Sequence, residues 1–376
     1  MLHHKAITLV IAGGGTGGHL FPGIAVAEEV LAVNTGSHVY FIGTGNRFET
    51  GVLSEKGFEQ RCIRVRSLKG KSVFQQIKTL ACLPGSIVGA ARILKKHRPD
   101  VVLGVGGYSA GPVVLAAWML RIPAALQEQN AIPGMTNRIL SRFADRIYLS
   151  FESTLIKAPL QKIRVTGNPV RKEIRSCFEN TPAIPRGPAT PKDPFTVFIV
   201  GGSQGAHRIN TAVMEALGQI KSKDRFAFIH QTGAADLDIV RKAYADHHLN
   251  GTVEPFFDHM QEPYRKADLV ICRAGASTIA ELTILGKGGI FVPYPFAADD
   301  HQAVNAHRLV TSGAAELILE KDLSGELLAK RIEHYALAPE KLAVMSGNMK
   351  QHAHPDAAKD IATDIIGLAT KKEASS

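Results

Sequence analysis

Five glycines and a histidine stand together near the start of the chain, in the stretch AGGGTGGHLFP. Gly13, Gly15 and Gly18 match the spacing G-x-G-x-x-G, and a histidine, His19, follows directly. Glycine permits positive φ angles and a close approach of the backbone to a ligand. The first N–H groups of a helix that follows such a turn attract an anion. The stretch therefore predicts a phosphate-binding loop beside an imidazole that suits a general base near neutral pH.

Two common nucleotide chemistries do not fit the residues around this loop. A dinucleotide site needs an acidic residue at the end of the second strand, and this strand ends in FIGTGN, with no carboxylate before Glu49. The P-loop pattern G-x-x-x-x-G-K-[ST] does not occur in the sequence either. We therefore expect neither NAD binding nor P-loop phosphoryl transfer.

A second segment, LVICRAGASTIAEL (269–282), also has the pattern of a strand, a tight turn and a helix. We expect Ser277 or Thr278 to cap the helix while its first N–H groups bind a pyrophosphate. Glu281 would accept hydrogen bonds from two ribose hydroxyls. The alternative is that this carboxylate only complements the positive end of the helix.

A polar cluster, Asp299-Asp300-His301-Gln302, lies shortly downstream of that segment. The two aspartates could form a metal pair, but acidic residues at this place are typical of a helix N-terminus. Gln302 both donates and accepts hydrogen bonds, which suits the reading of sugar hydroxyls.

Strands and helices must hold these groups in place. Sequence patterns typical of strands and of helices alternate along most of the chain. The expected strands are 8–11, 38–42, 101–105, 124–127, 147–149, 163–165, 227–231, 252–255, 269–272, 289–292 and 316–318. The expected helices include 22–33, 87–96, 110–120, 135–141 and 357–369. Such alternation indicates parallel sheets covered by helices on both faces. We therefore predict an α/β fold with two doubly wound, Rossmann-like domains.

The length of 376 residues allows two domains, and the glycine loop is repeated in the second half. Gly201 to Gly205 overlays Gly14 to Gly18, which puts Ala206 in the place of His19. Prolines at every third position of 182–194 predict an extended connector. We expect the interdomain linker here or slightly earlier, with domains at 1–170 and 171–349 and a helix near 350–370 that packs back on the first domain.

The composition is that of an ordinary soluble globular protein, with 45% hydrophobic and 21% charged residues. The spacing of the four cysteines fits neither a metal site nor a disulfide framework, so we expect reduced thiols in a cytosolic protein: Cys62, Cys82, Cys177 and Cys272. The N-terminus shows no export signal. The longest apolar run, Val113 to Leu120, is far too short to span a membrane.

The formal charge of +10 indicates an anionic partner, and the charge is unevenly placed. From Arg61 to Arg98 there are ten Lys and Arg residues and no acidic one. Inside this segment an apolar stripe at helical spacing (Val73, Phe74, Ile77, Leu80, Ala81) is ringed by three lysines (Lys69, Lys71, Lys78). This pattern favours reversible binding to an anionic membrane surface. The alternative is a core-packing helix with a solvated basic face. Nucleic-acid binding is disfavoured, because the only aromatic residue of the segment is Phe74.

Seven motifs, in chain order, resemble the MurG family of peptidoglycan N-acetylglucosaminyltransferases. They are GGTGGHLFPGIAVA, VLGVGGYSAGP, QEQNAIPGMTNR, GNPVR, GGSQGA, CRAGASTIAEL and DDHQAVNA. The resemblance implies a GT-B fold and the transfer of N-acetylglucosamine from UDP-GlcNAc, with no cofactor or metal. The implied acceptor is the 4-hydroxyl of undecaprenyl-pyrophosphoryl-MurNAc-pentapeptide. It also implies a peripheral location at the cytoplasmic face of the bacterial plasma (inner) membrane, with other cell-wall synthesis proteins as further partners.

The resemblance implies roles for single residues as well. Thr16, Gly17 and Gly18 match the first loop, at the substrate phosphates. Asn130 matches a donor-sugar contact, and Arg171 and Ser203 match donor-phosphate contacts. Phe257 falls where the family, often with isoleucine, holds uracil through backbone groups. The remaining matches are the pyrophosphate-and-ribose loop and the sugar-reading glutamine: Ala276, Ser277, Thr278, Ile279, Ala280, Glu281 and Gln302.

The expected reaction inverts the anomeric carbon, with helix N-termini stabilising the leaving pyrophosphate without a metal ion. His19 is the candidate general base, or alternatively only a loop-capping or phosphate-binding residue. Glu128, in QEQN, is the competing base, and Tyr108 is a candidate cleft or acceptor contact. Two other functions on the same fold remain open at this point: a UDP-GlcNAc 2-epimerase and a non-catalytic UDP-sugar sensor.

Overall fold

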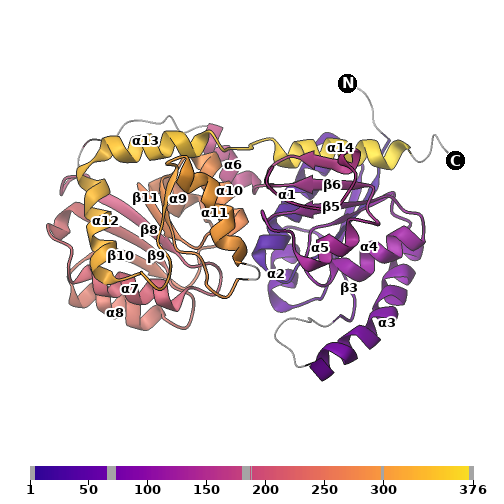
Figure 1. Cartoon of the computed structure of the whole chain (residues 1–376), viewed down its shortest axis with the longest axis horizontal. Coiled ribbons are helices and arrows are strands. Elements are labelled where there is room, and N and C mark those ends of the chain that lie inside the picture. The colour runs from indigo at the N-terminus through magenta and orange to yellow at the C-terminus, as the bar shows by residue number, and fades with distance from the viewer. Residues whose placement is uncertain (1–4, 66–72, 180–186, 188, 298–299, 372–376) are drawn as a thin grey trace. The chain divides into compact units, whose positions relative to one another are not determined.

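The computed structural model describes residues 5–65, 73–179, 187, 189–297 and 300–371. The chain divides into two compact units. In Figure 1 the first is coloured from indigo to magenta, with a yellow C-terminal helix, and the second from magenta through orange to yellow. Unit 1 comprises Met1–Arg171 and His354–Ser376, and unit 2 comprises Lys172–Ala353. Each unit contains one parallel sheet with helices packed on it, so the prediction of an α/β fold with two Rossmann-like sheets is confirmed.

The sheet of unit 1 has seven strands in the order β3-β2-β1-β4-β5-β6-β7. The strands are β1 (Thr8–Ala12), β2 (His38–Gly43), β3 (Glu59–Cys62), β4 (Val101–Gly104), β5 (Ala124–Glu128), β6 (Arg146–Leu149) and β7 (Ile163–Val165). The helices are α1 (Gly17–Val33), α2 (Arg47–Glu55), α3 (Val73–His97), α4 (Ala110–Met119), α5 (Met135–Leu140) and α14 (Ala357–Lys371). The strand order reverses between β1 and β4, and such a switch point is where doubly wound sheets bind ligands.

Alternate residues of the central strand β1 enter two separate cores. Leu9 and Ile11 pack with α1 and α14 on one face of the sheet. Val10 and Ala12 pack with α3 and α4 on the other face. All four side chains are fully buried, as expected for a parallel strand that is covered on both faces.

The last helix, α14, belongs to unit 1 and lies along α1 (Figure 1). Asp364 of α14 also accepts hydrogen bonds from two residues of β6, from Arg146 Nε at 2.7 Å and from the Tyr148 hydroxyl at 2.8 Å. This helix begins at Ala357, where the sequence pattern of 357–369 predicts it, and not as early as residue 350, where a separate helix, α13 (Pro339–Lys350), ends.

The sheet of unit 2 has six strands in the order β10-β9-β8-β11-β12-β13, so its switch point lies between β8 and β11. The strands are β8 (Phe195–Val200), β9 (Phe226–Gln231), β10 (Asn250–Glu254), β11 (Leu269–Cys272), β12 (Gly289–Phe291) and β13 (Ala315–Leu317). The helices are α6 (Lys172–Glu179), α7 (His207–Leu217), α8 (Leu237–Asp246), α9 (Gln261–Lys266), α10 (Ala276–Leu285), α11 (His301–Thr311), α12 (Gly325–Leu337) and α13.

Several elements differ from the sequence-based expectation. Helix α1 starts at Gly17 rather than at Pro22, because the N–H groups of His19 and Leu20 both donate to the Thr16 carbonyl. Helix α3 starts at Val73 rather than at residue 87, and α2 and β3 were not expected at all. The boundary between the units, after Arg171, precedes the proline-rich segment, of which residues 180–186 and 188 lie outside the described residues.

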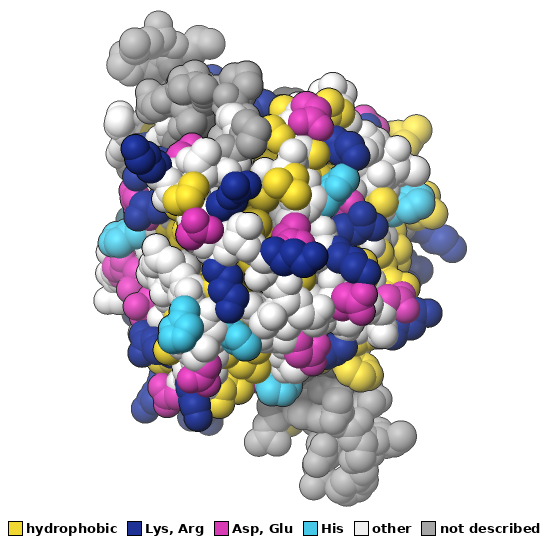
Figure 2. Space-filling model, turned by 90° about the vertical axis from the view of Figure 1, so that its left-hand side faces the viewer, with side chains coloured by type: hydrophobic (Ala, Val, Ile, Leu, Met, Phe, Trp, Pro, Cys, Tyr) yellow, Lys and Arg dark blue, Asp and Glu magenta, His cyan; other side chains and the backbone are white. Residues whose placement is uncertain are grey.

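The basic charge does not form a uniform field over the molecule. On the face seen in Figure 2, Lys and Arg side chains are interspersed with Asp and Glu side chains. The expected membrane-binding patch lies outside the described residues, since Lys69 and Lys71 are not described and neither is the side chain of Lys78. None of the helices described in the structure has the length and apolar character that crossing a bilayer requires.

Candidate active site

The carboxyl ends of β1 and β4 bring two glycine-rich loops together at the switch point of unit 1. Gly13 and Gly106 each have a positive φ, of 139° and 91°. A Cβ atom on Gly13 would lie 2.5 Å from the Gly106 carbonyl oxygen. The glycines of this first loop therefore allow backbone to pack on backbone, in addition to opening the start of α1 to a ligand.

His19 is the third residue of α1, and its half-buried ring lies against the loop that follows β4. A Cβ atom on Gly106 would come within 2.8 Å of His19 Cδ2 and 3.1 Å of Nε2. The other ring nitrogen, Nδ1, lies 3.2 Å from the hydroxyl oxygen of Thr16, the N-cap residue of α1. Tyr108, 39% exposed, follows in the same β4–α4 loop. The structure thus brings Thr16, His19 and Tyr108 into one part of unit 1.

Glu49 organises the other side of this loop, and the sequence analysis did not assign it a role. Its carboxylate, 1% exposed, accepts hydrogen bonds from the backbone N–H of Gly15 at 2.5 Å and of Gly45 at 2.9 Å. The hydroxyl and the N–H of Thr44 and Nε2 of Gln60 donate to it as well. Because the carboxylate is buried among these donors, it holds the first loop in place instead of facing a ribose.

Arg171 lies beside the first turns of α1. Its guanidinium carbon is 4.4 Å from the centre of the Phe21 ring, and Phe21 in turn contacts Phe48 edge to face. A Cβ atom on Gly17 would lie 2.9 Å from the Phe21 ring, so the ring stands directly beside the helix start. A guanidinium next to a helix N-terminus is a suitable partner for a phosphate.

Glu128 is buried and hydrogen-bonded, which is a poor state for a general base. The side chain is 1% exposed, and its two oxygens accept from the N–H groups of Asn130 and Gly134, both at 3.0 Å. Nδ2 of Asn137 donates to it at 2.9 Å, and Nδ2 of Asn130 at 3.3 Å. Glu128 therefore shapes the loop after β5 and orients Asn130, the residue matched to a donor-sugar contact.

The two glycine loops do not superpose as the sequence overlay suggested. The segment between the strand and the N-cap residue is longer in unit 2, where α7 begins at His207 with Ala206 as its N-cap. Ile209, the third residue of α7, therefore corresponds to His19, and not Ala206. Ser203, matched to a donor-phosphate contact, is exposed in the turn before the helix and is not part of the helix N-terminus.

Helix α10 begins directly after the turn that follows β11. Its N-cap is Gly275, so the expected capping by Ser277 or Thr278 is wrong; both lie within the first turn. The first turn carries no acidic side chain, and the helix dipole therefore favours an anion there. Glu281, one turn further and 6% exposed, accepts a hydrogen bond from the Tyr264 hydroxyl at 2.9 Å. The sequence offered no signal for Tyr264, which comes from α9.

Gln302 is the second residue of α11, and its side-chain oxygen accepts from the Tyr294 N–H at 2.9 Å. Arg273 supports the segment that carries Tyr294. Its Nη1 donates to the carbonyls of Val292 and Pro293, and its guanidinium carbon lies 5.3 Å from the centre of the Tyr294 ring. Asp300 is the N-cap residue of α11, whereas Asp299 lies outside the described residues.

The half-buried ring of Phe257 packs edge to face on Phe198, with ring centres 6.2 Å apart. Phe198 also contacts Tyr264 edge to face, at 5.3 Å. One aromatic cluster thus joins the segment of Phe257 to the tyrosine that orients Glu281. Since the ring of Phe257 is held by this cluster, replacement of isoleucine by phenylalanine leaves a backbone contact feasible at this position.

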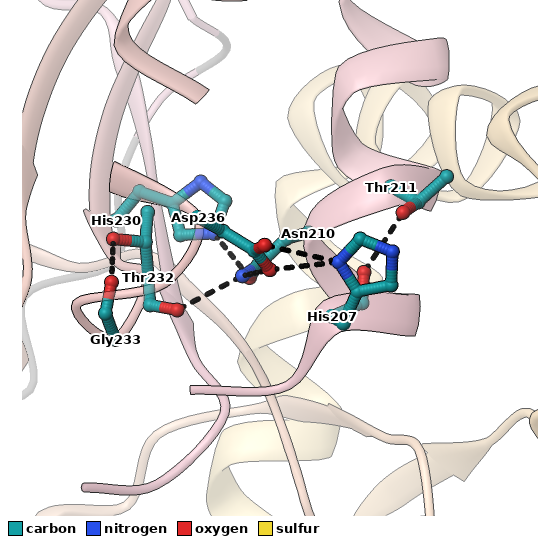
Figure 3. A network of polar contacts seen from close by, with 7 residues as sticks. All are labelled: His207, Asn210, Thr211, His230, Thr232, Gly233 and Asp236. Carbon is teal, nitrogen blue, oxygen red and sulfur yellow. Dashed lines mark hydrogen bonds and ion pairs between the residues drawn. The ribbon is translucent and has the colours of Figure 1, made fainter. Parts of the chain in front are cut away.

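A network of polar contacts joins the start of α7 to β9 and to the segment that follows β9 (Figure 3). Asp236 accepts from His207 Nδ1 at 3.0 Å and from Asn210 Nδ2 at 2.7 Å. His230 is fully buried and donates from Nε2 to the Asn210 side-chain oxygen, while Tyr244 donates to its Nδ1. Burial lowers the pKa of His230 to about 3, with Asp236 opposing the shift, so the ring is neutral at physiological pH.

Comparison with known proteins adds the family to this geometry. Residues 9–149 match the glycosyltransferase family 28 N-terminal domain, and residues 196–361 match the C-terminal domain of the same family. The chain is 43% identical to the UDP-N-acetylglucosamine–N-acetylmuramyl-(pentapeptide) pyrophosphoryl-undecaprenol N-acetylglucosamine transferase of Myxococcus xanthus, over 96% of the chain and 92% of that protein. The identity to the Geobacter sulfurreducens transferase of the same name is 44%, over 97% of the chain and 100% of the relative.

Solved structures agree with these relatives. The crystal structure of Acinetobacter baumannii MurG matches with a TM-score of 0.74 and 31% identity, over 96% of this chain and 99% of that one. The UDP-GlcNAc 2-epimerase of Neisseria meningitidis matches with a TM-score of 0.65 but only 15% identity, over 98% of this chain and 100% of that one, so it shares the fold alone. The chain has the GT-B fold and belongs to the MurG family of N-acetylglucosamine transferases, within glycosyltransferase family 28.

Proposed function

We propose that this protein transfers N-acetylglucosamine from UDP-GlcNAc to the 4-hydroxyl of undecaprenyl-pyrophosphoryl-MurNAc-pentapeptide in peptidoglycan synthesis. The names of the close relatives support this pair of substrates. The observation that carries the mechanism is the position of His19, whose ring lies between Thr16 and Gly106 at the switch point of unit 1. We further propose that unit 1 binds the acceptor and that unit 2 binds most of the donor.

The reaction is a single displacement at the anomeric carbon of the donor sugar. The oxygen of the acceptor hydroxyl attacks this carbon, and its proton passes to Nε2 of His19. The bond between the sugar and UDP breaks, and its electron pair stays on the oxygen of the departing pyrophosphate. Attack opposite to the leaving group turns the α-linked donor into a β-linked product.

Thr16 suits the task of setting the tautomer of His19. A base that acts through Nε2 needs its proton on Nδ1, and the Thr16 hydroxyl oxygen is positioned to accept from Nδ1 at 3.2 Å. The buried and fourfold hydrogen-bonded state of Glu128 argues for His19 as the base over Glu128. Glu128 would serve instead to position Asn130 at the donor sugar.

The charge on the departing pyrophosphate needs stabilisation. The first turn of α10, from Ala276 to Thr278, would provide N–H groups and a favourable dipole, and Ser203 would add a hydroxyl. Glu281, oriented by Tyr264, would accept from the ribose hydroxyls, and Gln302, oriented by Tyr294, would read the sugar. Arg171 and the start of α1 would meet a substrate phosphate.

We also propose that the protein works as a peripheral protein at the cytoplasmic face of the bacterial plasma membrane. The acid-free run from Arg61 to Arg98 supports this location, because cations beside a short apolar patch bind anionic lipid reversibly. A lipid-linked acceptor, of the kind that the relatives' names specify, would be met at that surface.

One assay tests the function against its alternatives. UDP release from UDP-GlcNAc is measured with and without a muramyl-lipid acceptor, and the sugar is analysed by chromatography. We expect UDP only in the presence of the acceptor, together with a β-linked disaccharide. An epimerase would convert the donor with no lipid present, and a UDP-sugar sensor would release no UDP in either case.

A further inference from the structure

Gln231 is the last residue of β9, and its side chain is buried, with 2% exposed. Strand β9 lies between β8 and β10, where Gln231 pairs with Val200 on one side and with Glu254 on the other. Those two partners are the last residues of their own strands. The loops that follow β8 and β10 therefore leave the sheet on either side of this one side chain.

The amide of Gln231 bonds to both loops. Nε2 donates to the carbonyl of Gly202, at 3.0 Å, in the loop after β8. Oε1 accepts from the N–H of Phe257, at 2.9 Å, in the loop after β10. A carbonyl only accepts and an N–H only donates, so the two partners fix the orientation of the amide. Among side chains of this length, only glutamine makes both bonds at neutral pH.

Other contacts hold the loop after β8 close to Gln231. The residue after Gln231, Thr232, lies against Gly205, where a Cβ atom would overlap the Thr232 carbonyl. The ring of Phe257 is anchored on Phe198, so the loop after β10 is held at its side chain as well as at its N–H. The side chain of Gln231 thus hydrogen-bonds to the loop after β8 and to the loop after β10 at the same time.

We propose that Gln231 is a positioning residue that couples the two halves of the donor site. This inference rests on the proposed function, in which Ser203 meets the donor phosphates and Phe257 meets the uracil. The bond to Gly202 sets the position of Ser203, and the bond to Phe257 sets the backbone that reads the base. Gln231 itself touches no substrate; it determines the spacing between the phosphate contact and the base contact.

Two substitutions separate the two bonds. Gln231→Met keeps the length of the side chain and removes both bonds. Gln231→Glu keeps an oxygen that accepts from Phe257 but cannot donate to Gly202. The control is Asn348→Leu, because the Asn348 amide also donates to loop carbonyls of unit 2, those of Ser312 and Gly313, away from the proposed donor residues.

The measurements are calorimetric affinities for UDP, CDP and uridine, thermal unfolding, and hydrogen exchange of the Phe257 amide by NMR without ligand. For Gln231→Met we expect faster exchange at Phe257, a roughly tenfold weaker UDP affinity and a smaller preference for UDP over CDP, from the loss of buried hydrogen bonds. For Gln231→Glu we expect the Phe257 amide to exchange slowly and the preference for UDP over CDP to persist. The affinity for UDP should fall more than the affinity for uridine. Asn348→Leu should lower the unfolding temperature and leave UDP affinity unchanged.

The proposal is overturned if Gln231→Met binds UDP as the unaltered protein does, with the same preference over CDP, or if Phe257 exchanges equally in both Gln231 variants. A lower unfolding temperature alone would then mark Gln231 as merely structural. Failure of the proposed function looks different: the unaltered protein would bind no UDP, or would bind UDP and CDP equally. The exchange measurement on Phe257 still decides the coupling in that case, because it needs no ligand.

Discussion

Individual side chains of unit 2 divide the recognition of the donor between them. Hydrogen bonds orient both side chains: the Tyr264 hydroxyl donates to Glu281, and the Tyr294 N–H donates to Gln302. Glu281 presents a carboxylate, which only accepts, whereas Gln302 presents an amide, which also donates. This difference in chemistry suits ribose hydroxyls in the first case and the varied groups of an N-acetyl sugar in the second.

We therefore expect Glu281→Ala and Gln302→Ala to have different effects in calorimetry. Glu281→Ala should weaken UDP and UDP-GlcNAc alike, by roughly 1.5–3 kcal/mol for the loss of a charged hydrogen bond. Gln302→Ala should keep UDP affinity and lose the preference for UDP-GlcNAc over other UDP-sugars. Glu326→Ala serves as the control, because that exposed carboxylate pairs only with Lys330 among the described ion pairs. Equal losses of UDP affinity in the two site variants would contradict the assignment.

Strands and helices bring these residues together, and the network around His230 shows how. His230 lies on β9, Asn210 on α7 and Tyr244 on α8, so one neutral imidazole links three elements. Asn210 continues the network to Asp236 and to the carbonyl of Thr232. The helix that follows the glycine loop is thereby tied to the neighbouring strand, which also carries Gln231.

The neutral state of His230 makes the stability of unit 2 depend on pH. Burial lowers the pKa of His230 to about 3 in the folded protein, whereas an unfolded histidine titrates near 6.5. Between these values the unfolded state binds more protons, so stability falls as the pH falls below about 6.5. We expect the free energy of unfolding to drop by about 1.4 kcal/mol per pH unit from this residue. The test is urea unfolding between pH 7 and pH 5. Over this range the free energy of unfolding should fall less in the His230→Gln protein than in the unaltered protein. An equal dependence of that free energy on pH in both proteins would refute the assignment.

The sequence was sufficient to predict most buried strands and the positions of the glycine loops. Runs such as TLVIA and LVIC contain apolar residues that suit both faces of a covered sheet, and they form strands as expected. Strand β3, EQRC, was missed because it lies at the edge of the sheet, pairs only with β2 and carries polar residues. Helix α2 was missed as well, with only Glu49 and Leu53 buried.

The site was harder to predict, because its supporting contacts join residues far apart in the chain. Family motifs identified Glu281 and Gln302, but no local pattern indicated that Tyr264 and Tyr294 orient them. Glu49, the first carboxylate after β2, comes too late in the sequence to bind a ribose, and no local pattern predicts another role for it. In the structure Glu49 accepts from the Gly15 N–H, across 34 residues of sequence, and holds the first loop.

The whole molecule carries a charge of +10, and its distribution along the chain bears on location. Ten basic residues and no acidic one occur from Arg61 to Arg98, whereas the face in Figure 2 mixes both signs. An anionic bilayer attracts a basic cluster within about a Debye length, and an apolar patch adds to the affinity.

We expect this basic run to hold the protein on membranes. Changing Lys69, Lys71 and Lys78 to Glu should abolish sedimentation with anionic liposomes, because it reverses the local charge. Turnover of a short-chain, soluble acceptor should stay unchanged. The same three changes at Lys221, Lys223 and Lys242 of unit 2 control for net charge, and that protein should still sediment. The hypothesis fails if the first variant sediments like the unaltered protein.

The role of His19 is tested most directly by the pH dependence of turnover in the His19→Ala protein, measured together with its affinity for UDP-GlcNAc. We expect donor affinity to stay nearly intact, because unit 2 is proposed to hold most of the donor. Turnover should fall by about 10²–10⁴-fold, and the acidic limb of the pH–rate profile should vanish with the imidazole. The control is His334→Ala, on α12, which should leave donor affinity, turnover and the pH–rate profile unchanged. If turnover falls but the acidic limb survives, the proton goes to another group; if donor affinity falls instead, His19 binds phosphate and is not the base.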